Sequence, residues 1–406
     1  MITNLNLNPF IKKYVIKREE SIFKTDLSNY NDELQNKISN KSVLVIGGAG
    51  SIGSFFIKAL LKFKPTKLVV VDINENGLTE LVRDLRSSTV YNVPSNFITY
   101  PVDFGDKIFD KIYRNHGPFE IVANFAAHKH VRTEKDIFSI EAMIENNVLK
   151  ARKLLNLLLE FQPEHFFCVS SDKAANPVNI MGASKKLMEE LIIAYSSVIP
   201  IKTARFANVA FSNGSLPQGF INRLNKNQAW SCPLGIKRFF VSPEESGQLC
   251  LIASVLGETG DIFFPKLDKN NDTVFFENIA KDLLNYLGLE IDICESDEEA
   301  KRKAGLLNNN PKSFPVYFFK SDTSGEKSYE EFYTGNEVLD LKTYKSLGVI
   351  KNSLKRDIGE IDIIFKNLET IFSEKNVLKS DIINLLKKYL PNFNHIETGK
   401  NLDSKM

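Results

Sequence analysis

A short apolar run followed at once by three regularly spaced glycines is the feature that most restricts how this chain can fold. Residues 42–46 are apolar enough for a buried strand, and Gly47, Gly50 and Gly53 follow at the start of an amphipathic segment. Glycines at this spacing allow a tight turn and a close approach of backbone to a pyrophosphate at a helix N-terminus. A strand, a glycine loop and a helix in this order predict a dinucleotide-binding α/β fold.

The same alternation of apolar runs and helical patterns continues beyond the glycine loop. Further strands are predicted at residues 67–72, 97–101, 120–125, 165–170 and 201–206, with helical spacing between them. Strands and helices that alternate in this way predict a doubly wound parallel sheet.

The pattern divides the chain into four regions. Residues 1–40 predict an N-terminal helical extension, and 41–210 predict the dinucleotide-binding domain. Shorter segments interrupted by Gly and Pro at 211–340 predict a smaller substrate-binding region. Residues 341–406, rich in Lys, Leu, Ile and Asn at helical spacing, predict a C-terminal helical tail, with 401–406 disordered.

The composition argues against several classes of partner. The formal net charge is +2 and the charged residues are scattered, so nothing favours a nucleic-acid partner. No apolar run reaches the roughly 18–20 residues of a membrane span, and the N-terminus has no signal-peptide pattern. The four cysteines are widely spaced, with no histidine cluster beside them. They indicate buried thiols in a reducing cytoplasm, and no metal site is expected.

The residues that end the second and fourth strands indicate how the dinucleotide binds. Ser51 and Ile52 belong to the glycine loop. Asp72 stands where an acid accepts hydrogen bonds from the adenosine ribose. A carboxylate there repels a 2′-phosphate and no Arg follows it, so NAD is expected rather than NADP. Ala126 and Ala127 are small enough to let the dinucleotide pass.

A second group of polar residues follows the strand predicted at 165–170. Ser171, Asp172 and Lys173 stand at its carboxyl end, and Lys185 lies one turn past Met181 in the helix that follows. Because ligands of doubly wound sheets bind at the carboxyl ends of the strands, we expect these side chains in one crevice. The thioether of Met181 can neither give nor take a proton, so another group must do so.

The stretch from Ser171 to Lys185 resembles the active site of extended short-chain dehydrogenases/reductases, with Met181 in place of the usual Tyr. The Asp-Lys pair and the segment Asn-Ile-Met-Gly-Ala-Ser-Lys resemble the corresponding sequences of one branch in particular. This branch is the UDP-N-acetylglucosamine 4,6-dehydratases of bacterial surface-polysaccharide synthesis, some of which also carry Met. The resemblance covers roughly residues 40–335. It implies NAD-dependent conversion of UDP-N-acetylglucosamine to a UDP-4-keto-6-deoxy sugar.

The resemblance also implies catalytic roles. Asp172 would be the acid for the leaving hydroxyl of carbon 6, and Lys173 the base at carbon 5. Ser171 would hydrogen-bond the sugar, and Lys185 would hold the nicotinamide ribose. The proton of the carbon-4 hydroxyl would pass to Asp172, Lys185 or a positioned water. Met181 would line the pocket, and its presence implies that the configuration at carbon 5 is retained.

Further contacts follow from the same resemblance. Asp103 would contact the adenine, Asn147 matches a structural Asn beside the cofactor, and Lys129 would face the cofactor or the sugar. Arg205 is interpreted as a structural ion pair. The substrate-binding residues that the resemblance implies are Lys129, His130, Asn208, Arg238 and Glu326.

Two other functions remain open from the sequence. A UDP-sugar 4-epimerase would share every cofactor feature, but it needs no acid–base pair beside carbons 5 and 6. A catalytically inactive, NAD-binding regulatory protein would explain Met181. In each case we expect a homo-oligomer.

Overall fold

The computed structural model describes residues 6–308, 311–320, 327, 329–353 and 355–397. Within this part of the chain, the largest sheet has nine strands in the order β14-β15-β10-β6-β5-β4-β1-β2-β3. The strands from β10 to β3 are parallel, which confirms the predicted doubly wound sheet. Their bounds are β1 (Ser42–Ile46), β2 (Lys67–Asp72), β3 (Asn96–Pro101), β4 (Ile121–Asn124), β5 (His165–Val169), β6 (Ile201–Ala204) and β10 (Ile262–Pro265).

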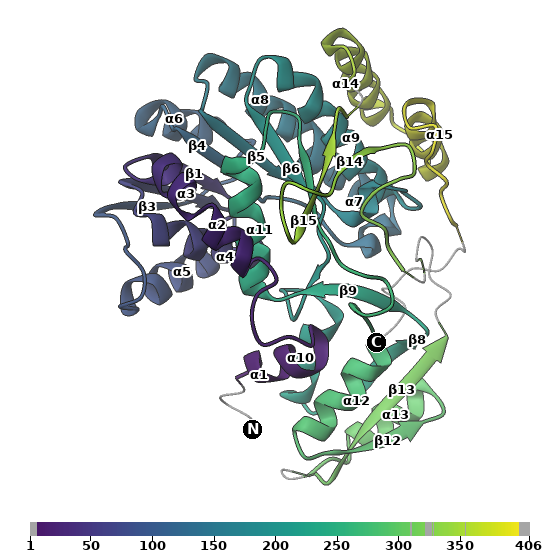
Figure 1. The fold of residues 1–406 in the computed structure, drawn as a ribbon. Coiled ribbons are helices and arrows are strands. Elements are labelled where there is room, and N and C mark those ends of the chain that lie inside the picture. Colours follow the sequence, from purple (N-terminus) through teal and green to yellow (C-terminus); the bar gives the residue numbers. More distant parts are fainter. Residues whose placement is uncertain (1–5, 309–310, 321–326, 328, 354, 398–406) are drawn as a thin grey trace.

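Helices cover both faces of this sheet (Figure 1). Val43 and Val45 of β1 point into a core with α3 (Asn31–Ile38), α4 (Ser51–Leu60), α5 (Glu75–Ser87) and α11 (Pro243–Leu256). Leu44 and Ile46 point to the opposite core, because side chains alternate along a strand. That second core contains α6 (Lys107–His116), α7 (Ile137–Ile144), α8 (Lys150–Glu160) and α9 (Ile180–Ala194).

The order of the strands places the ligand crevice. The chain proceeds outward from β1 to β3 and then returns to β4 on the other side of β1. Loops that follow β1 and β4 therefore diverge at their carboxyl ends, and ligands of such sheets bind at this point.

A smaller region packs beneath the large sheet (Figure 1). It holds two three-stranded sheets, β11-β9-β7 and β12-β13-β8, with its own apolar core around Trp230. The bounds are β7 (Asn208–Val209), β8 (Trp230–Leu234), β9 (Lys237–Val241), β11 (Thr273–Phe275), β12 (Glu290–Cys294), β13 (Ser313–Lys320), α10 (Leu216–Leu224), α12 (Phe276–Tyr286) and α13 (Asp297–Ala304).

The N-terminal residues form short helices: α1 (Asn8–Phe10), a π-helix (Ile11–Val15), α2 (Lys24–Asn29) and α3. Phe10, Ile11 and Val15 are buried in the core of the smaller region, whereas α3 packs under the large sheet. The N-terminal segment therefore connects the two parts of the molecule.

The expectation of a purely helical C-terminal region is wrong at its start. Residues within 341–406 form β15 (Leu347–Lys351), which pairs antiparallel with β10 and with β14 (Val338–Asp340). Leu347 and Val349 enter one core and Ile350 the other, so this short apolar run is a buried strand. Two helices follow, α14 (Ile358–Ser373) and α15 (Lys379–Tyr389). Residues 401–406 lie outside the described part of the chain.

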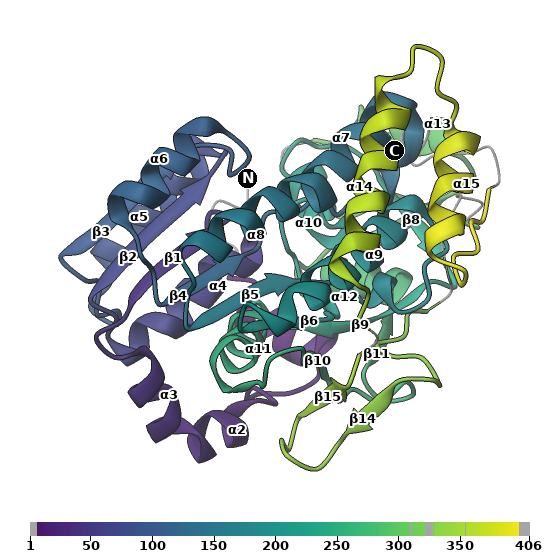
Figure 2. The ribbon, with the colours of Figure 1, turned by 90° about the horizontal axis from the view of Figure 1, so that it is seen from above.

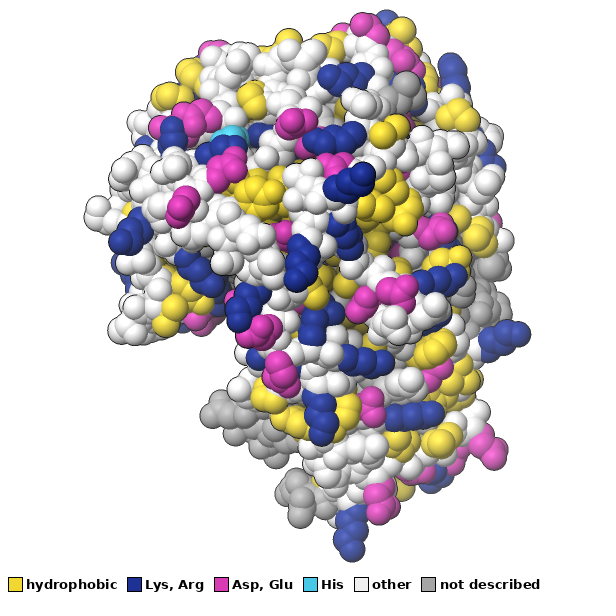
Figure 3. Space-filling view, in the orientation of Figure 1, with side chains coloured by type: hydrophobic (Ala, Val, Ile, Leu, Met, Phe, Trp, Pro, Cys, Tyr) yellow, Lys and Arg dark blue, Asp and Glu magenta, His cyan; other side chains and the backbone are white. Residues whose placement is uncertain are grey.

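Figure 2 shows β14 and β15 at one end of the large sheet, with α14 beside α9. On the face seen in Figure 3, basic and acidic side chains are interspersed, as the scattered charges of the sequence predict. None of the helices in the described part of the chain has both the length and the hydropathy of a membrane span.

Candidate functional site

The glycine loop between β1 and α4 is shaped by close backbone contacts. Gly47 has φ +75°, and a Cβ there would lie 2.6 Å from the backbone nitrogen of Ala126. A Cβ at Gly53 would lie 2.4 Å from the carbonyl oxygen of Gly47. Gly50 is the N-cap of α4 and offers no side chain to the first-turn N–H groups. This loop therefore leaves the helix N-terminus accessible to an anion such as a pyrophosphate.

A cavity of about 180 Å³ opens beside this loop, at the point where the strand order reverses. Its lining brings together six of the predicted cofactor residues, which come from four separate loops: Gly47, Gly50, Asp72, Asp103, Ala126 and Ala127. Ile73, Phe104 and Phe125 add apolar walls. The residues present fit the adenosine half of a dinucleotide.

Asp72 and Asp103 are both held in fixed orientations at this cavity. The Asp72 carboxylate accepts hydrogen bonds from the backbone nitrogens of Ala49 (2.9 Å) and Asn74 (2.9 Å). Asp103 accepts from Lys150 Nζ at 2.5 Å and from the backbone of Gly105. Burial raises the pKa of Asp103, but the hydrogen bonds and charge of Lys150 outweigh it and the pKa lies below its ordinary value. Asp103 is therefore ionised, and Lys150 occupies one of its oxygens.

Asn147 does not line the cavity but holds two parts of the protein together. It lies in the π-helix Glu145–Leu149 and is buried. Its side-chain amide donates to the carbonyl of His128 (2.9 Å) and to Ser184 Oγ (3.0 Å), and its oxygen accepts from His128 N. Asn147 thus connects the loop after β4 to α9.

The predicted catalytic pair lies in a short 3₁₀ helix, Asp172–Ala174, directly after β5. Lys173 Nζ is 3.1 Å from Asp172 Oδ1, and Ser171 Oγ donates to the same oxygen at 2.9 Å. Ser171 also caps the 3₁₀ helix by accepting from the backbone of Lys173. Asp172 is buried, with 5% of its surface exposed. The three residues therefore form one connected group at the strand end.

A carboxylate outside the predicted set completes this group. Glu330 Oε1 lies 3.7 Å from Lys173 Nζ, and the Glu330 side chain is buried. Among the described residues, its other oxygen has no hydrogen-bond partner, although Lys327 Nζ lies 3.9 Å away. The predicted substrate-binding residue Glu326 lies outside the described residues. Glu330, four residues later in the sequence, is the carboxylate that reaches the catalytic pair.

Burial and charge act against each other on Lys173. Burial lowers the pKa of its amine. The negative charges of Asp172 and Glu330 raise the pKa by more than burial lowers it, so the pKa lies above its ordinary value. The pKa of Glu330 is raised, mainly by burial and also by Asp172. Arg238 acts on both groups through its positive charge and donates to the carbonyl of Lys327 at 2.9 Å. Arg238 therefore lies beside the catalytic group, and substrate binding by Arg238 stays a prediction.

Met181 and Lys185 lie on α9 and are buried, with 2% and 3% of their surfaces exposed. The backbone nitrogen of Met181 donates to Glu134 Oε1 at 3.1 Å. Lys185 Nζ donates to the carbonyl of Val169 at the end of β5, also at 3.1 Å. Burial lowers the pKa of Lys185. Lys185 thus holds the strand end in this structure, and it does not line the dinucleotide cavity.

Lys129 and His130 meet the turn that precedes α10. Lys129 Nζ donates to the carbonyl of Asn213 at 2.8 Å, and Asn213 N donates to Ser51 Oγ at 2.9 Å. A Cβ on Gly214 would lie 2.9 Å from the His130 ring. Burial lowers the pKa of Lys129. These contacts connect the glycine loop at Ser51 with the predicted sugar-facing loop.

The remaining predicted residues separate into two kinds. Asn208 is partly exposed at the start of β7, next to the chain segment that leaves β6. Arg205 is fully buried and is occupied by Glu189 (2.6 Å) and Glu337 (2.7 Å). Arg205 therefore forms structural ion pairs with Glu189 and Glu337, in line with its interpretation from the sequence.

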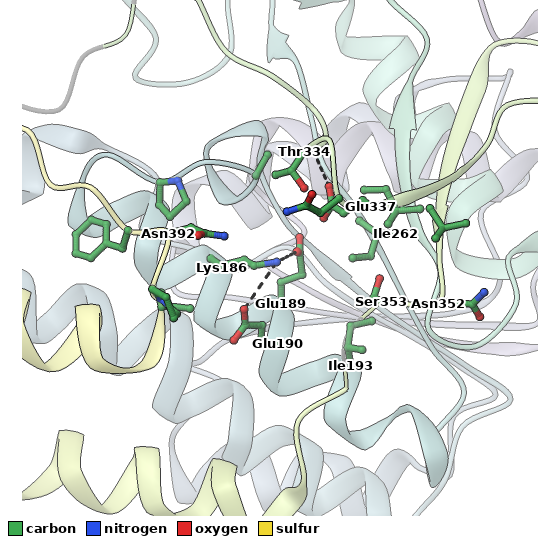
Figure 4. Close-up of a pocket in the computed structure, with 18 of the residues that line it drawn as sticks. Lys186, Glu189, Glu190, Ile193, Ile262, Thr334, Glu337, Asn352, Ser353 and Asn392 are labelled. Carbon is green, nitrogen blue, oxygen red and sulfur yellow. Dashed lines mark hydrogen bonds and ion pairs between the residues drawn. The ribbon is translucent and has the colours of Figure 1, made fainter.

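Figure 4 shows a second cavity, of about 260 Å³, whose lining includes Ala175 and Pro177, which follow the catalytic pair in the sequence. None of the predicted site residues lines it. Its charged groups face one another: Lys186 Nζ lies 3.2 Å from Glu189 and 3.8 Å from Glu190. This cavity is separate from the candidate active site, and the C-terminal residues Leu390–Phe393 form one of its walls.

The fold and the glycine-loop cavity define a dinucleotide-binding protein with the architecture of the extended short-chain dehydrogenases/reductases. The sequence profile of the family described as "Polysaccharide biosynthesis protein" matches residues 43–352, and the chain belongs to this family.

Relatives in this family and around it carry several names. The uncharacterized membrane protein MJ1061 of Methanocaldococcus jannaschii is 30% identical over 78% of this chain and 88% of its own length. The UDP-N-acetylglucosamine 4,6-dehydratase (inverting) of Campylobacter jejuni is 27% identical over 60% of this chain and 72% of its own. The UDP-glucose 4-epimerase of Rickettsia massiliae is 29% identical over 75% and 82%. The chain spans only 54% of another relative, the capsular polysaccharide biosynthesis protein CapD of Staphylococcus aureus.

Solved structures share the fold. Pen from Bacillus thuringiensis superposes with a TM-score of 0.63 at 19% identity, over 88% of this chain and 99% of that one. UDP-glucuronic acid 4-epimerase from Bacillus cereus, solved with NAD, gives a TM-score of 0.55 at 19% identity, over 71% and 89%. Because both structures are only 19% identical in sequence to this chain, their similarity shows that the fold is shared and no more.

Proposed function

We propose that this protein is an NAD-dependent UDP-N-acetylglucosamine 4,6-dehydratase of polysaccharide biosynthesis. The observation that carries the proposal is the buried Asp172–Lys173 contact of 3.1 Å at the carboxyl end of β5. An acid and a base at one point are what removal of water across carbons 5 and 6 requires. A 4-epimerase has no step that uses such a pair.

The cofactor assignment is supported by the cavity beside the glycine loop. Asp72 lines this cavity, and backbone N–H groups hold both of its carboxylate oxygens. A carboxylate there would accept hydrogen bonds from the adenosine ribose hydroxyls, which disfavours a 2′-phosphate. NAD bound there would take the hydride of carbon 4 and return it to carbon 6. NAD would thus be back in its oxidised form at the end of each turnover, and none of it would be consumed.

The elimination can be written with the residues of the catalytic group. Oxidation at carbon 4 acidifies the carbon-5 proton, which Lys173 removes as a neutral amine. Asp172, as a carboxylic acid, protonates the carbon-6 hydroxyl, and the C–O bond breaks to release water. Transfer of one proton across the 3.1 Å contact converts the ammonium and carboxylate into the amine and the acid that this step needs. The proton of the carbon-4 hydroxyl passes to Asp172, Lys185 or a positioned water.

We also propose that carbon 5 keeps its configuration. Met181 offers no proton on the opposite side of the ring, so Lys173 returns the proton to the face from which it came. Four free cysteines, all buried, suit a reducing compartment, and we propose the cytoplasm.

The second candidate is a UDP-N-acetylhexosamine 4-epimerase, which the epimerase names among the relatives favour. Mass spectrometry of the product made from UDP-N-acetylglucosamine separates the two. A product lighter by one water supports the dehydratase, and an isomer of unchanged mass supports the epimerase.

A further inference from the structure

The chain beyond α15 returns to the residues that follow the catalytic pair Asp172–Lys173. The backbone nitrogen of Asn394 donates to the carbonyl of Pro177 at 3.2 Å, and that of Ile396 donates to Val178 at 2.9 Å. Pro177 and Val178 directly precede Asn179, the N-cap of α9. The C-terminal segment, residues 390–396, therefore lies along the connection between the catalytic pair and α9.

One side chain of this segment points inward. The His395 side chain is 3% exposed, and its Nε2 lies 3.1 Å from Glu134 Oε2. Phe393 packs edge-on against the His395 ring, with centroids 5.9 Å apart, and is itself buried in the large core. His395 is thus fixed between an apolar ring and a carboxylate.

Glu134 connects His395 to the first turn of α9. The first N–H groups of a helix have no acceptor within the helix. Asn179 Oδ1 accepts from Gly182 N at 2.7 Å, and Glu134 Oε1 accepts from Met181 N at 3.1 Å. Glu134 comes from a different element, the 3₁₀ helix Val131–Lys135, and a carboxylate at this position is favoured by the helix dipole. Because the Glu134 side chain is only 6% exposed, its second oxygen needs a partner, and His395 supplies it.

One side of the C-terminal segment borders a cavity. Leu390, Pro391, Asn392 and Phe393 line this cavity of about 260 Å³, and Figure 4 shows Asn392 at its edge. Leu390 and Phe393 are buried in the large core, so their packing and the hydrogen bonds of Asn394 and Ile396 together fix where the segment lies.

We propose that His395 is a positioning residue for the active site. Through Glu134 it holds the first turn of α9, the helix that carries Met181 and Lys185 beside the catalytic pair. The inference rests on the proposed dehydratase function, because it assigns to the C-terminal segment a role in orienting that site. Loss of this contact displaces reacting groups by a fraction of a helical turn, which slows the chemical step more than it weakens binding.

The first test compares kinetics of three variants of the full chain. His395→Ala removes the donor, and His395→Gln restores an N–H donor of similar reach. Ile396→Ala is the matched control, because the Ile396 side chain is 42% exposed and its backbone hydrogen bond is kept. We expect His395→Ala to lower kcat about tenfold with KM changed by less than about threefold. His395→Gln should recover most of the rate, and Ile396→Ala should match the wild type.

The second test does not depend on turnover. Hydrogen–deuterium exchange of the amides in residues 178–185 should accelerate in His395→Ala and stay at the wild-type rate in Ile396→Ala. If the wild type dehydrates no UDP-sugar, the proposed function fails, while the exchange rates still decide whether His395 holds α9. Unchanged kcat in an active His395→Ala enzyme, or equal exchange in His395→Ala and Ile396→Ala, overturns the proposal.

Discussion

The ammonium group of Lys173 lies 3.1 Å from the carboxylate of Asp172, its neighbour in the sequence. Adjacent residues can meet in this way because both belong to one turn of 3₁₀ helix, in which Ser171 Oγ caps the backbone of Lys173. Their proximity makes the protonation state of one depend on the other.

Removal of either member of this pair should abolish dehydration and leave the cofactor bound. Lys173→Met and Asp172→Asn are each expected to lower kcat by about 10²-fold or more, since each lacks one proton-transfer group. Lys186→Met is the matched control, because Lys186 lies on α9 and pairs with Glu189 and Glu190 away from the pair. Product formation and the amount of NAD that copurifies are measured together. A Lys173→Met enzyme with wild-type kcat would contradict the assignment.

Glu330→Gln should move the pH dependence of the reaction to lower pH. The charge of Glu330 raises the pKa of Lys173, so its removal lowers that pKa, and the one proton that the Asp172–Lys173 pair needs is lost to solvent at lower pH. The falling limb of kcat/KM against pH, where the pair loses this proton, is the quantity to measure. Glu331→Gln is the control, because the exposed Glu331 contacts Asn176 instead. A limb that stays in place in Glu330→Gln would show that Glu330 does not act on the base.

Asp72→Asn should weaken the preference for NAD over NADP. The substitution removes the negative charge that faces a 2′-phosphate. The amide keeps an oxygen for one of the two backbone N–H groups, of Ala49 or Asn74, which donate to different oxygens of Asp72. We expect the ratio of the two dissociation constants to change about tenfold, which equals about 1.4 kcal/mol. Glu80→Gln, on the exposed side of α5, should leave the ratio as it is. Tighter binding of NADP than NAD by the wild type would contradict the cofactor assignment.

His165 should make the fold sensitive to mild acid. Burial, with the charges of Lys202, Lys37 and Lys41, lowers the pKa of His165 to about 3 from 6.5. The neutral ring contacts Lys202 Nζ at 2.8 Å in the folded protein. Because the folded pKa lies below the unfolded one, this stability is present above about pH 6.5 and is lost as the pH falls toward 3.

The melting temperature of His165→Gln should therefore fall less than that of the wild type between about pH 7.5 and about pH 5. Both proteins lose stability through other groups in this range, so the comparison isolates His165. Equal losses in the two proteins would show that the ring is not held neutral by its surroundings.

Much of the fold could be predicted because its strands are apolar runs that end at residues with special roles. The strand after which Gly47 turns and the strand that ends at Asp72 both appear at the predicted positions. β15 lies in the region predicted as a helical tail, because residues 341–406 are rich in Lys, Leu, Ile and Asn at helical spacing. Its structure depends on pairing between Val349 and Phe263, and such a long-range contact leaves no local periodicity.

The candidate site divides in the same way. Ser171, Asp172 and Lys173 are consecutive, so their proximity could be predicted from one motif. Glu330 and His395 reach the same region from segments far along the chain. Their contacts depend on how the smaller region and the C-terminal segment pack, which the spacing of residues within a motif does not encode. The predicted substrate contacts all stay predictions, and one of them, Glu326, lies outside the described residues.

The most direct test of the central claim is the mass of the product formed from UDP-N-acetylglucosamine in deuterated water. The dehydratase mechanism predicts loss of one water and gain of one deuterium at carbon 5, where Lys173 exchanges its proton with solvent before returning it. Proton NMR of that product should show the carbon-5 configuration of the substrate. A product of unchanged mass without deuterium would identify an epimerase, and NAD binding without turnover of any UDP-sugar would identify an inactive protein. Either result would contradict the assignment of Asp172 and Lys173 as the acid and base of an elimination.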